Sequence, residues 1–140
     1  MTGPRTTPTV VPTMLYEDAP AAIDWLCAAF GFESHLVVAG EPGTIAHAQL
    51  TYGNGMIMLG SASNEYGSLI KPPALLGGVG SHSVFVIVPD ADEHHDRALA
   101  AGAKTISQPR DQDYGGRGYG CTDPEGHLWY FGTYDPWAAT

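Results

Sequence analysis

Imidazole side chains are the groups of this chain best suited to chemistry near neutral pH, because they can bind a proton or a metal ion there. His47 stands two positions before Gln49, a spacing that puts both side chains on one face of a strand. His47 is then either a hydrogen-bonded residue of a pocket wall or a contact to a ligand. His82 lies beside the start of a predicted strand at Ser83 and is a weaker candidate for a metal ligand.

The other candidate motifs have simpler explanations. His94 and His95 lie in a predicted helix, where packing or solvent exposure explains them better than catalysis does. His127 follows a turn that it caps or packs against. Residues 114–119 are rich in glycine, but no helix follows them, so they do not form a phosphate-binding loop. The sequence contains no catalytic triad, dinucleotide fingerprint or Cys/His zinc spacing.

The composition fits one compact globular domain. The chain has 140 residues, of which 44% are hydrophobic and 15% charged, enough for a real core. Its formal net charge of −9, with only six Lys and Arg, argues against a nucleic-acid partner, because phosphates need a basic face. It favours a cationic or neutral ligand, although acidic surfaces also keep proteins soluble.

We expect a cytoplasmic location and no membrane partner. Residues 1–9 are rich in Thr and Pro and lack the apolar core of a secretory signal. No later stretch approaches the length of a membrane span. Residues 1–9 are predicted to form a flexible N-terminal arm.

Two halves of the chain repeat one order of elements. The first half predicts a strand at residues 10–16, followed by a helix that is capped by Asp18 and stopped by Gly31. Three further strands are predicted at residues 32–38, 44–51 and 56–59. The second half predicts a strand, a helix, a strand and a hairpin, over residues 83–88, 91–101, 104–107 and around 124–126. A constant step relates Gly31 to Gly102 (102 − 31 = 71) and Gly55 to Gly126 (126 − 55 = 71).

This order predicts an α+β fold of tandem βαβββ modules that form a curved, cup-like mixed sheet with helices on the outside. The modules are expected at residues 10–60 and 81–134. The connection at residues 61–80 is long for an idle linker, so it is either a lid or a surface crossover.

Residues 16–25 (YEDAPAAIDW) and 123–131 (DPEGHLWYF), within such a repeat, resemble the vicinal oxygen chelate superfamily, in particular its glyoxalase/bleomycin-resistance branch. The superfamily includes glyoxalase I, extradiol dioxygenases, fosfomycin-resistance transferases and bleomycin-resistance proteins. The resemblance spans residues 10–134. It implies a pocket between modules or subunits and a homodimer.

The resemblance also indicates where a metal would be held. In metal-dependent members the ligands come from the first and last strands of the modules. The 71-residue step puts these positions at Pro12, Leu59, Ser83 and Tyr130. None of them offers the imidazole, carboxylate or thiolate that a first-row metal needs. We therefore expect no metal and no cofactor, and a mostly apolar floor that suits a bulky organic ligand.

Hairpin geometry predicts the pocket walls. If each hairpin closes with a three-residue turn, Leu59 faces Gln49 and Tyr130 faces Gly120, whereas a two-residue turn reverses the assignment. Met58 would then point away from the cup. Gly120 would leave space for a flat group against the ring of Tyr130. The predicted ligand-binding residues are Met14, His47, Gln49, Leu59, Ser83, Phe85 and Tyr130.

The leading prediction is a metal-free protein that binds and sequesters a small drug- or peptide-like molecule in an acidic, aromatic-lined pocket, resembling bleomycin-resistance proteins and implying antibiotic resistance. One alternative is a metal-dependent glyoxalase-like lyase or dioxygenase with unusual ligands such as His47 and His82. Another is a metal-free enzyme with His47 as base and Tyr130 as proton donor. The sequence determines neither the ligand nor any catalytic residue.

Overall fold

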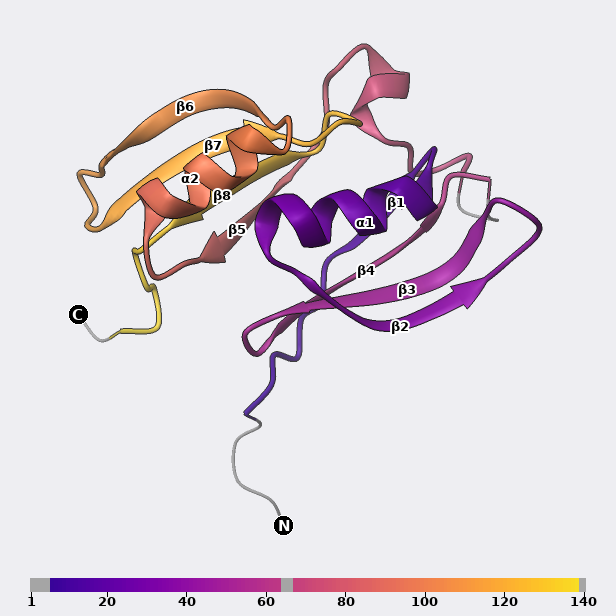
Figure 1. Ribbon diagram of the computed structural model, residues 1–140, viewed down its shortest axis with the longest axis horizontal. Helices are drawn as coiled ribbons and strands as arrows, with labels where there is room; N and C mark the ends of the chain where they lie inside the picture. Colours follow the sequence, from indigo (N-terminus) through magenta and orange to yellow (C-terminus); the bar gives the residue numbers. More distant parts are fainter. Residues whose placement is uncertain (1–5, 64–66, 139–140) are drawn as a thin grey trace.

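The structure is a computed structural model that describes residues 6–63 and 67–138. Within these ranges the helices and strands follow one another in a simple repeated order (Figure 1). Their bounds are β1 (Thr13–Tyr16), α1 (Ala19–Phe30), β2 (Glu33–Ala39), β3 (Ile45–Tyr52), β4 (Gly55–Ser61), the short 3₁₀ helix η1 (Pro73–Leu76), β5 (Ser83–Ile87), α2 (Ala91–Ala100), β6 (Lys104–Asp111), β7 (Arg117–Thr122) and β8 (Leu128–Gly132).

Each half of the chain forms one four-stranded sheet. The strand orders are β1-β4-β3-β2 and β5-β8-β7-β6. In both sheets the first strand runs parallel to the last, and the other neighbours are antiparallel. The predicted α+β fold of tandem βαβββ modules with curved sheets is therefore confirmed.

Helix α1 begins and ends where its sequence signals stand. The Asp18 carboxylate accepts a hydrogen bond from the Ala21 N–H at 3.2 Å, which caps the helix. Pro20 lies in the first turn, where its missing N–H has no partner to lose. Gly31 ends the helix with a φ of 85°, a left-handed conformation that glycine adopts freely.

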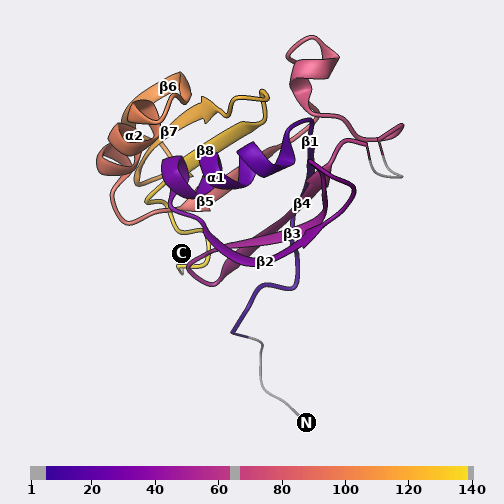
Figure 2. The same ribbon diagram turned by 45° about the vertical axis from the view of Figure 1, so that its right-hand side comes forward.

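The two helices join the modules through one shared core (Figure 2). The Trp25 indole N–H in α1 donates to the Ala101 carbonyl just after α2, at 2.7 Å. In return, the Arg97 guanidinium in α2 donates to the Ala28 carbonyl at 2.8 Å. Carbonyls near the end of each helix are thus bound by a side chain of the other helix, which satisfies groups that a helix end leaves open.

His94 is a further link between the modules, and its two ring nitrogens have different roles. Its Nε2 lies 2.9 Å from the Phe30 carbonyl oxygen and its Nδ1 lies 2.5 Å from the Tyr119 hydroxyl. Because a carbonyl only accepts, Nε2 carries the proton, and Nδ1 accepts from Tyr119. Burial lowers the pKa of His94. These contacts agree with a packing role.

The turn between β7 and β8 is held by the buried carboxylate of Asp123. Its Oδ2 accepts hydrogen bonds from the Tyr16 hydroxyl at 2.6 Å and from the Trp129 indole N–H at 3.1 Å. Its Oδ1 accepts from the main-chain N–H groups of Glu125 and His127. Burial, followed by the charge of Asp123, raises the pKa of Tyr16 well above its usual value. One carboxylate therefore fixes the turn and binds it to β1 of the other module.

Glu125 extends this connection to the start of α1. Its carboxylate accepts the main-chain N–H groups of Glu17 and Asp18 at 2.5 and 2.9 Å. A negative charge is favourable at the start of a helix, where N–H groups lack partners. The Asp-Pro-Glu-Gly turn is therefore a contact between the modules as well as a turn.

The connection predicted at residues 61–80 contains η1, and residues 64–66 lie outside the described part of the chain. Of the predicted N-terminal arm, residues 6–9 are exposed and residues 1–5 are not described. None of the described helices is long and apolar enough to cross a membrane.

Candidate functional site

The two hairpins turn differently. The second has the predicted three-residue turn, because the Asp123 N–H donates to the His127 carbonyl at 3.0 Å. In the first, Tyr52 pairs with Gly55, which leaves two residues in the turn. Here Gly53 has the positive φ of 56°, and the sequence Gly-Asn suits a two-residue turn with glycine first. The prediction of a three-residue turn was wrong for this hairpin.

The shorter turn reverses the faces of β4. Leu59 pairs with Ala48 rather than Gln49, and Gln49 pairs with Met58. Because side chains alternate along a strand, this one-residue difference moves every side chain to the opposite face. Leu59 lies in the core and is 3% exposed. Met58, predicted to point away from the cup, lies on the open face instead.

Equivalent residues on the first and last strands of the two modules are 72 positions apart rather than 71, in keeping with the extra residue in the second turn. The pair Thr13 and Met58 corresponds to the pair Phe85 and Tyr130, because 85 − 13 = 72 and 130 − 58 = 72. The constant 71-residue step therefore fails on the first and last strands. We call the faces with these pairs the open faces, since the helices pack against the opposite faces.

Tyr130 lies flat on the open face of the second sheet. A Cβ atom built on Gly120, its partner on β7, would lie only 2.6 Å from Cε1 and 2.9 Å from Cδ1 of Tyr130. The ring of Tyr130 thus fills the space over Gly120 that was predicted to take a flat ligand group. The residue is nevertheless 38% exposed, so the ring's outer face is open.

Phe85 lies in the same way beside it. A Cβ atom built on Gly132 would lie 3.3 Å from Cζ and 3.4 Å from Cε1 of Phe85, and Phe85 is 42% exposed. Phe85 and Tyr130 are direct partners on neighbouring strands. We call these two rings the aromatic platform. Such a platform can stack a planar group, because offset stacking of aromatic rings is favourable.

The aromatic platform borders a hollow of about 330 Å³, the second-sheet hollow. Its lining residues are Ser83, Phe85, Gln112, Tyr114, Gly118, Tyr119, Tyr130 and Phe131. The volume lies near the lower end of the range for pockets that bind small organic molecules. Three of the predicted site residues, Ser83, Phe85 and Tyr130, meet here.

A second hollow of about 390 Å³, the first-sheet hollow, lies on the other module. Its lining residues are Thr13, Met14, Leu15, Ala46, His47, Met58, Leu59, Gly60 and Ile70. It brings together the predicted residues Met14, His47 and Leu59. The two hollows share no lining residue among those described, so neither of them is lined by both modules. A separate hollow of about 600 Å³ does lie between the modules, with Met14, His82 and His127 among its lining residues.

His47 is the polar group of the first-sheet hollow best placed to meet a ligand. Its Nε2 lies 3.0 Å from the Gln49 amide nitrogen, which donates to it. Nδ1 then carries the ring proton and is a hydrogen-bond donor. The predicted acid-base partner Tyr130 lines the other hollow, so one chain does not bring His47 and Tyr130 together.

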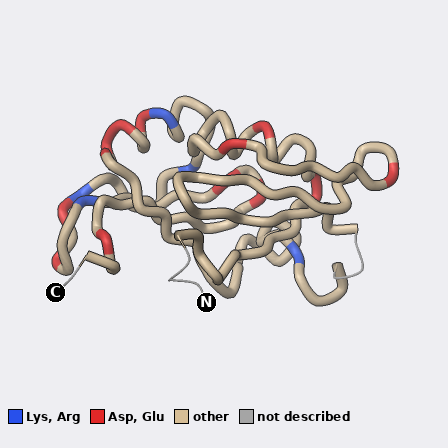
Figure 3. The backbone as a smooth tube through the Cα atoms, turned by 90° about the horizontal axis from the view of Figure 1, so that it is seen from below, with Lys and Arg blue, Asp and Glu red and all other residues tan. Residues whose placement is uncertain are grey.

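Charged residues are absent from the described linings of both hollows. Strands β1, β3, β4, β5 and β8 contain no Asp, Glu, Lys or Arg, and they run in tan through Figure 3. Acidic side chains lie elsewhere, for example Asp92, Glu93 and Asp96 in α2. The predicted acidic pocket is therefore wrong for these two hollows, and the net charge is no argument for a cationic ligand there.

A family model described as Glyoxalase/Bleomycin resistance protein/Dioxygenase superfamily matches residues 10–131, which include both modules. The chain belongs to this superfamily. The family predicted from the two sequence segments and the repeat is thus confirmed.

Individual relatives agree with this assignment. Uncharacterized protein Rv0887c of Mycobacterium tuberculosis is 32% identical over 126 residues, which cover 89% of this chain and 74% of the relative. TioX from Micromonospora sp. ML1 has a crystal structure with a TM-score of 0.69 and 36% identity, covering 88% of this chain and 95% of TioX. The fosfomycin resistance protein FosX from Listeria monocytogenes shares the fold, with a TM-score of 0.65 and 14% identity over 94% of this chain and 97% of FosX.

The superfamily includes metal-dependent members, but the donors in the described part of the chain do not fit a metal. The described residues contain no group of three or more His, Cys, Asp or Glu side chains that could hold one. His47, of the unusual pair considered from the sequence, lines the first-sheet hollow. His82 lines a neighbouring hollow that shares Thr13, Met14 and Ile70 with it, and no third donor joins the pair among the described residues. A divalent first-row metal needs several such ligands in one fixed geometry.

The lining residues that sequence reasoning missed include Met58, Ile70, Gln112 and Tyr114. A signal existed for Met58, since Gly-Asn between two strands is typical of a two-residue turn. Nothing in the local sequence indicates Ile70, because its place depends on the course of the connection between modules.

Proposed function

We propose that this protein binds and sequesters a small planar aromatic molecule of drug- or peptide-like type, without a metal. The observation that carries the proposal is the aromatic platform. Phe85 and Tyr130 both lie flat over glycines, and their outer faces are exposed in an uncharged hollow. Rings that served only to fill a core would be buried, whereas a stacking site needs rings with an exposed face.

The expected energetics suit an aromatic ligand. Each aromatic pair contributes roughly 0.5–1.5 kcal/mol beyond the burial of apolar area. Burial itself contributes about 25 cal/mol per Å². His47 adds a hydrogen-bond donor in the first-sheet hollow, which suits a carbonyl or ring nitrogen of the ligand.

A second copy of the same chain is the partner that fits the open faces. They expose large apolar side chains, among them Phe85, Ile87 and Tyr130, which is typical of an interaction surface. A chain with a net charge of −9 repels its own copy, so contact is most favourable through uncharged strands. We therefore propose a homodimer in which the open face of the first module of one chain faces the open face of the second module of its partner. His47 and Tyr130 at this contact then come from different chains.

Sequestration of a toxic aromatic drug would protect the cell that makes the protein. The family description includes bleomycin resistance, which supports a role in drug resistance. The cytoplasm is the proposed place of this activity, on the grounds of the sequence alone.

Calorimetric titration tests the proposal. The panel contains neutral polycyclic aromatic compounds, planar aromatic drugs and glycopeptides, against the full chain and its Tyr130→Ala and Phe85→Ala variants. We expect at least one planar compound to bind, and each variant to weaken that binding about tenfold, or ~1.4 kcal/mol. Absence of binding to every planar compound would remove the proposal.

A further inference from the structure

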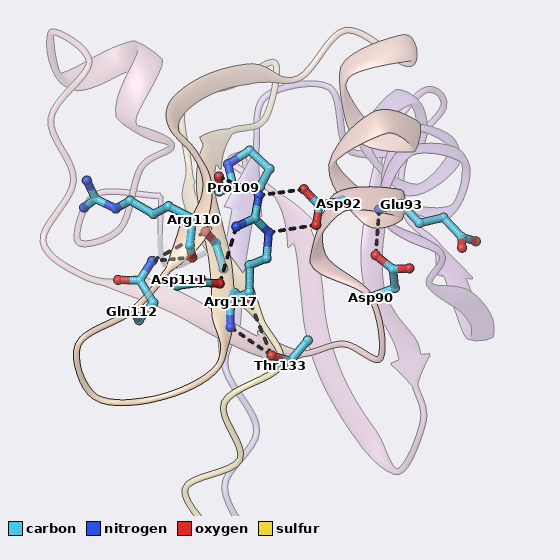
Figure 4. Close-up of polar contacts among 10 residues, drawn as sticks. Asp90, Asp92, Glu93, Pro109, Arg110, Asp111, Gln112, Arg117 and Thr133 are labelled. Carbon is cyan, nitrogen blue, oxygen red and sulfur yellow. Dashed lines mark hydrogen bonds and ion pairs between the residues drawn. The ribbon is translucent and has the colours of Figure 1, made fainter.

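Arg110 lies on the open face of the second sheet. It pairs across β6 and β7 with Gly118, which lines the second-sheet hollow. Figure 4 shows its side chain pointing away from Arg117 and from α2, where Asp92 lies. Its guanidinium is therefore on the same side of the sheet as the aromatic platform.

The carboxylates of Asp92 and Asp111 are engaged by Arg117 rather than by Arg110. Arg117 binds Asp92 through two nitrogen atoms at 2.8 and 3.1 Å, and it reaches Asp111 at 3.4 Å (Figure 4). Among the described residues, the ion pairs are Arg117 with Asp92 and Arg117 with Asp111, and Arg110 takes part in neither. Arg110 thus keeps its fork of N–H donors for an external acceptor.

The sheet places Arg110 within reach of a ligand on the platform. Arg110, Gly118 and Gly132 form one row across β6, β7 and β8. The ring of Phe85 leans over Gly132. Gly118, the next residue of the row, has no side chain that would separate this ring from Arg110. Neighbouring strands lie about 4.8 Å apart, so the row spans ~10 Å, comparable to a two-ring aromatic system with one substituent.

We propose that Arg110 makes the second-sheet hollow selective for aromatic carboxylic acids, with the ring stacked on the platform and the carboxylate bound by the guanidinium. A planar guanidinium fork matches a carboxylate with two parallel hydrogen bonds. The inference rests on the proposed function and adds the chemical class of its ligand.

The test compares 2-naphthoic acid with its neutral amide, 2-naphthamide, by calorimetric titration. Binding is measured for the full chain, for Arg110→Gln and for the matched control Lys104→Gln. Lys104 lies on the same strand, roughly 20 Å away at 3.3 Å per residue, so its replacement removes the same charge at a distance.

We expect the full chain and the Lys104→Gln variant to bind the acid about tenfold more tightly than the amide. Arg110→Gln should bind both probes equally, with the affinity for the amide unchanged. Added salt should reduce the preference for the acid, because it screens an exposed charge pair. Equal binding of both probes to the full chain, or a preference that survives Arg110→Gln, would overturn this inference alone. Binding of neither probe would also overturn this inference, whereas the proposed function fails only if no planar compound of the wider panel binds.

Discussion

The phenol ring of Tyr130 rests directly on the backbone of Gly120, and a methyl group at position 120 would meet its Cε1 at 2.6 Å. Gly120→Ala must therefore lift the ring from the sheet. We expect this change to weaken binding of a planar aromatic probe about tenfold, or ~1.4 kcal/mol. Calorimetric titration of the variant with 2-naphthamide measures the loss.

A double-mutant cycle shows whether this loss acts through the ring. In a Tyr130→Ala background, Gly120→Ala meets no ring, so it should have little further effect on affinity. Losses that add up fully in the double variant would show that Gly120 affects binding by another route.

The buried carboxylate of Asp123 predicts a large effect on stability. Asp123→Asn replaces an acceptor oxygen by an NH₂ group that faces N–H or O–H donors, which leaves at least one buried N–H donor without a partner. We expect the free energy of unfolding to fall by roughly 2–4 kcal/mol, measured by urea denaturation.

Asp113→Asn is the matched control for this change. Asp113 is exposed in the connection between β6 and β7. Substitutions at such positions usually change stability by less than about 0.5 kcal/mol. Equal stability of the two variants would show that Asp123 is not the centre of the contact between modules.

His94 predicts a pH dependence of stability. Its folded-state pKa lies below the ordinary value of 6.5, mainly because burial disfavours the charged ring. The unfolded chain therefore binds a proton at this residue more readily than the folded chain. The contribution of neutral His94 is complete above pH 6.5 and is lost as pH falls from there toward the folded-state pKa.

Urea denaturation of the full chain and of His94→Gln, from about pH 8 to about pH 5, measures this contribution. Glutamine keeps an N–H donor for the Phe30 carbonyl but does not titrate. We expect the variant to be less stable at high pH and to lose less stability as pH falls. A pH dependence identical to that of the full chain would assign the effect to other residues.

The exposed apolar side chains of the open faces predict self-association. Sedimentation velocity of the full chain should show a dimer, held by apolar contacts beside the aromatic platform, such as those of the exposed Ile87. Ile87→Glu adds a charge to this face and should shift the equilibrium toward monomer, because like charges repel across the contact. A monomer at all concentrations, or a dimer unaffected by Ile87→Glu, would contradict the proposed arrangement.

The order of elements could be predicted because its signals are local. The capping residue Asp18 and the terminating glycine Gly31 mark α1 in the sequence, and the structure uses both. Strand β6 was predicted to end at residue 107 but runs to Asp111, past Pro109. Proline is tolerated there because β6 is an edge strand of its sheet.

The faces of the strands were less predictable because they depend on single-residue differences. Leu59 and Tyr130 both stand four positions after a turn glycine, yet Leu59 lies in the core and Tyr130 lies on the open face. They differ because the second turn is one residue longer than the first. The flat positions of Phe85 and Tyr130 depend on glycines of other strands, which no local pattern contains. Arg110 is revealed only by the pairing of β6 with β7.

The location of a bound aromatic molecule tests the central claim most directly. Amide NMR spectra and intermolecular NOEs are recorded during titration with 2-naphthamide. The account predicts NOEs from the probe to the rings of Phe85 and Tyr130, and shifts of the Gly118, Gly120 and Gly132 amides. NOEs confined to other surfaces, such as the exposed side of α1, would contradict it.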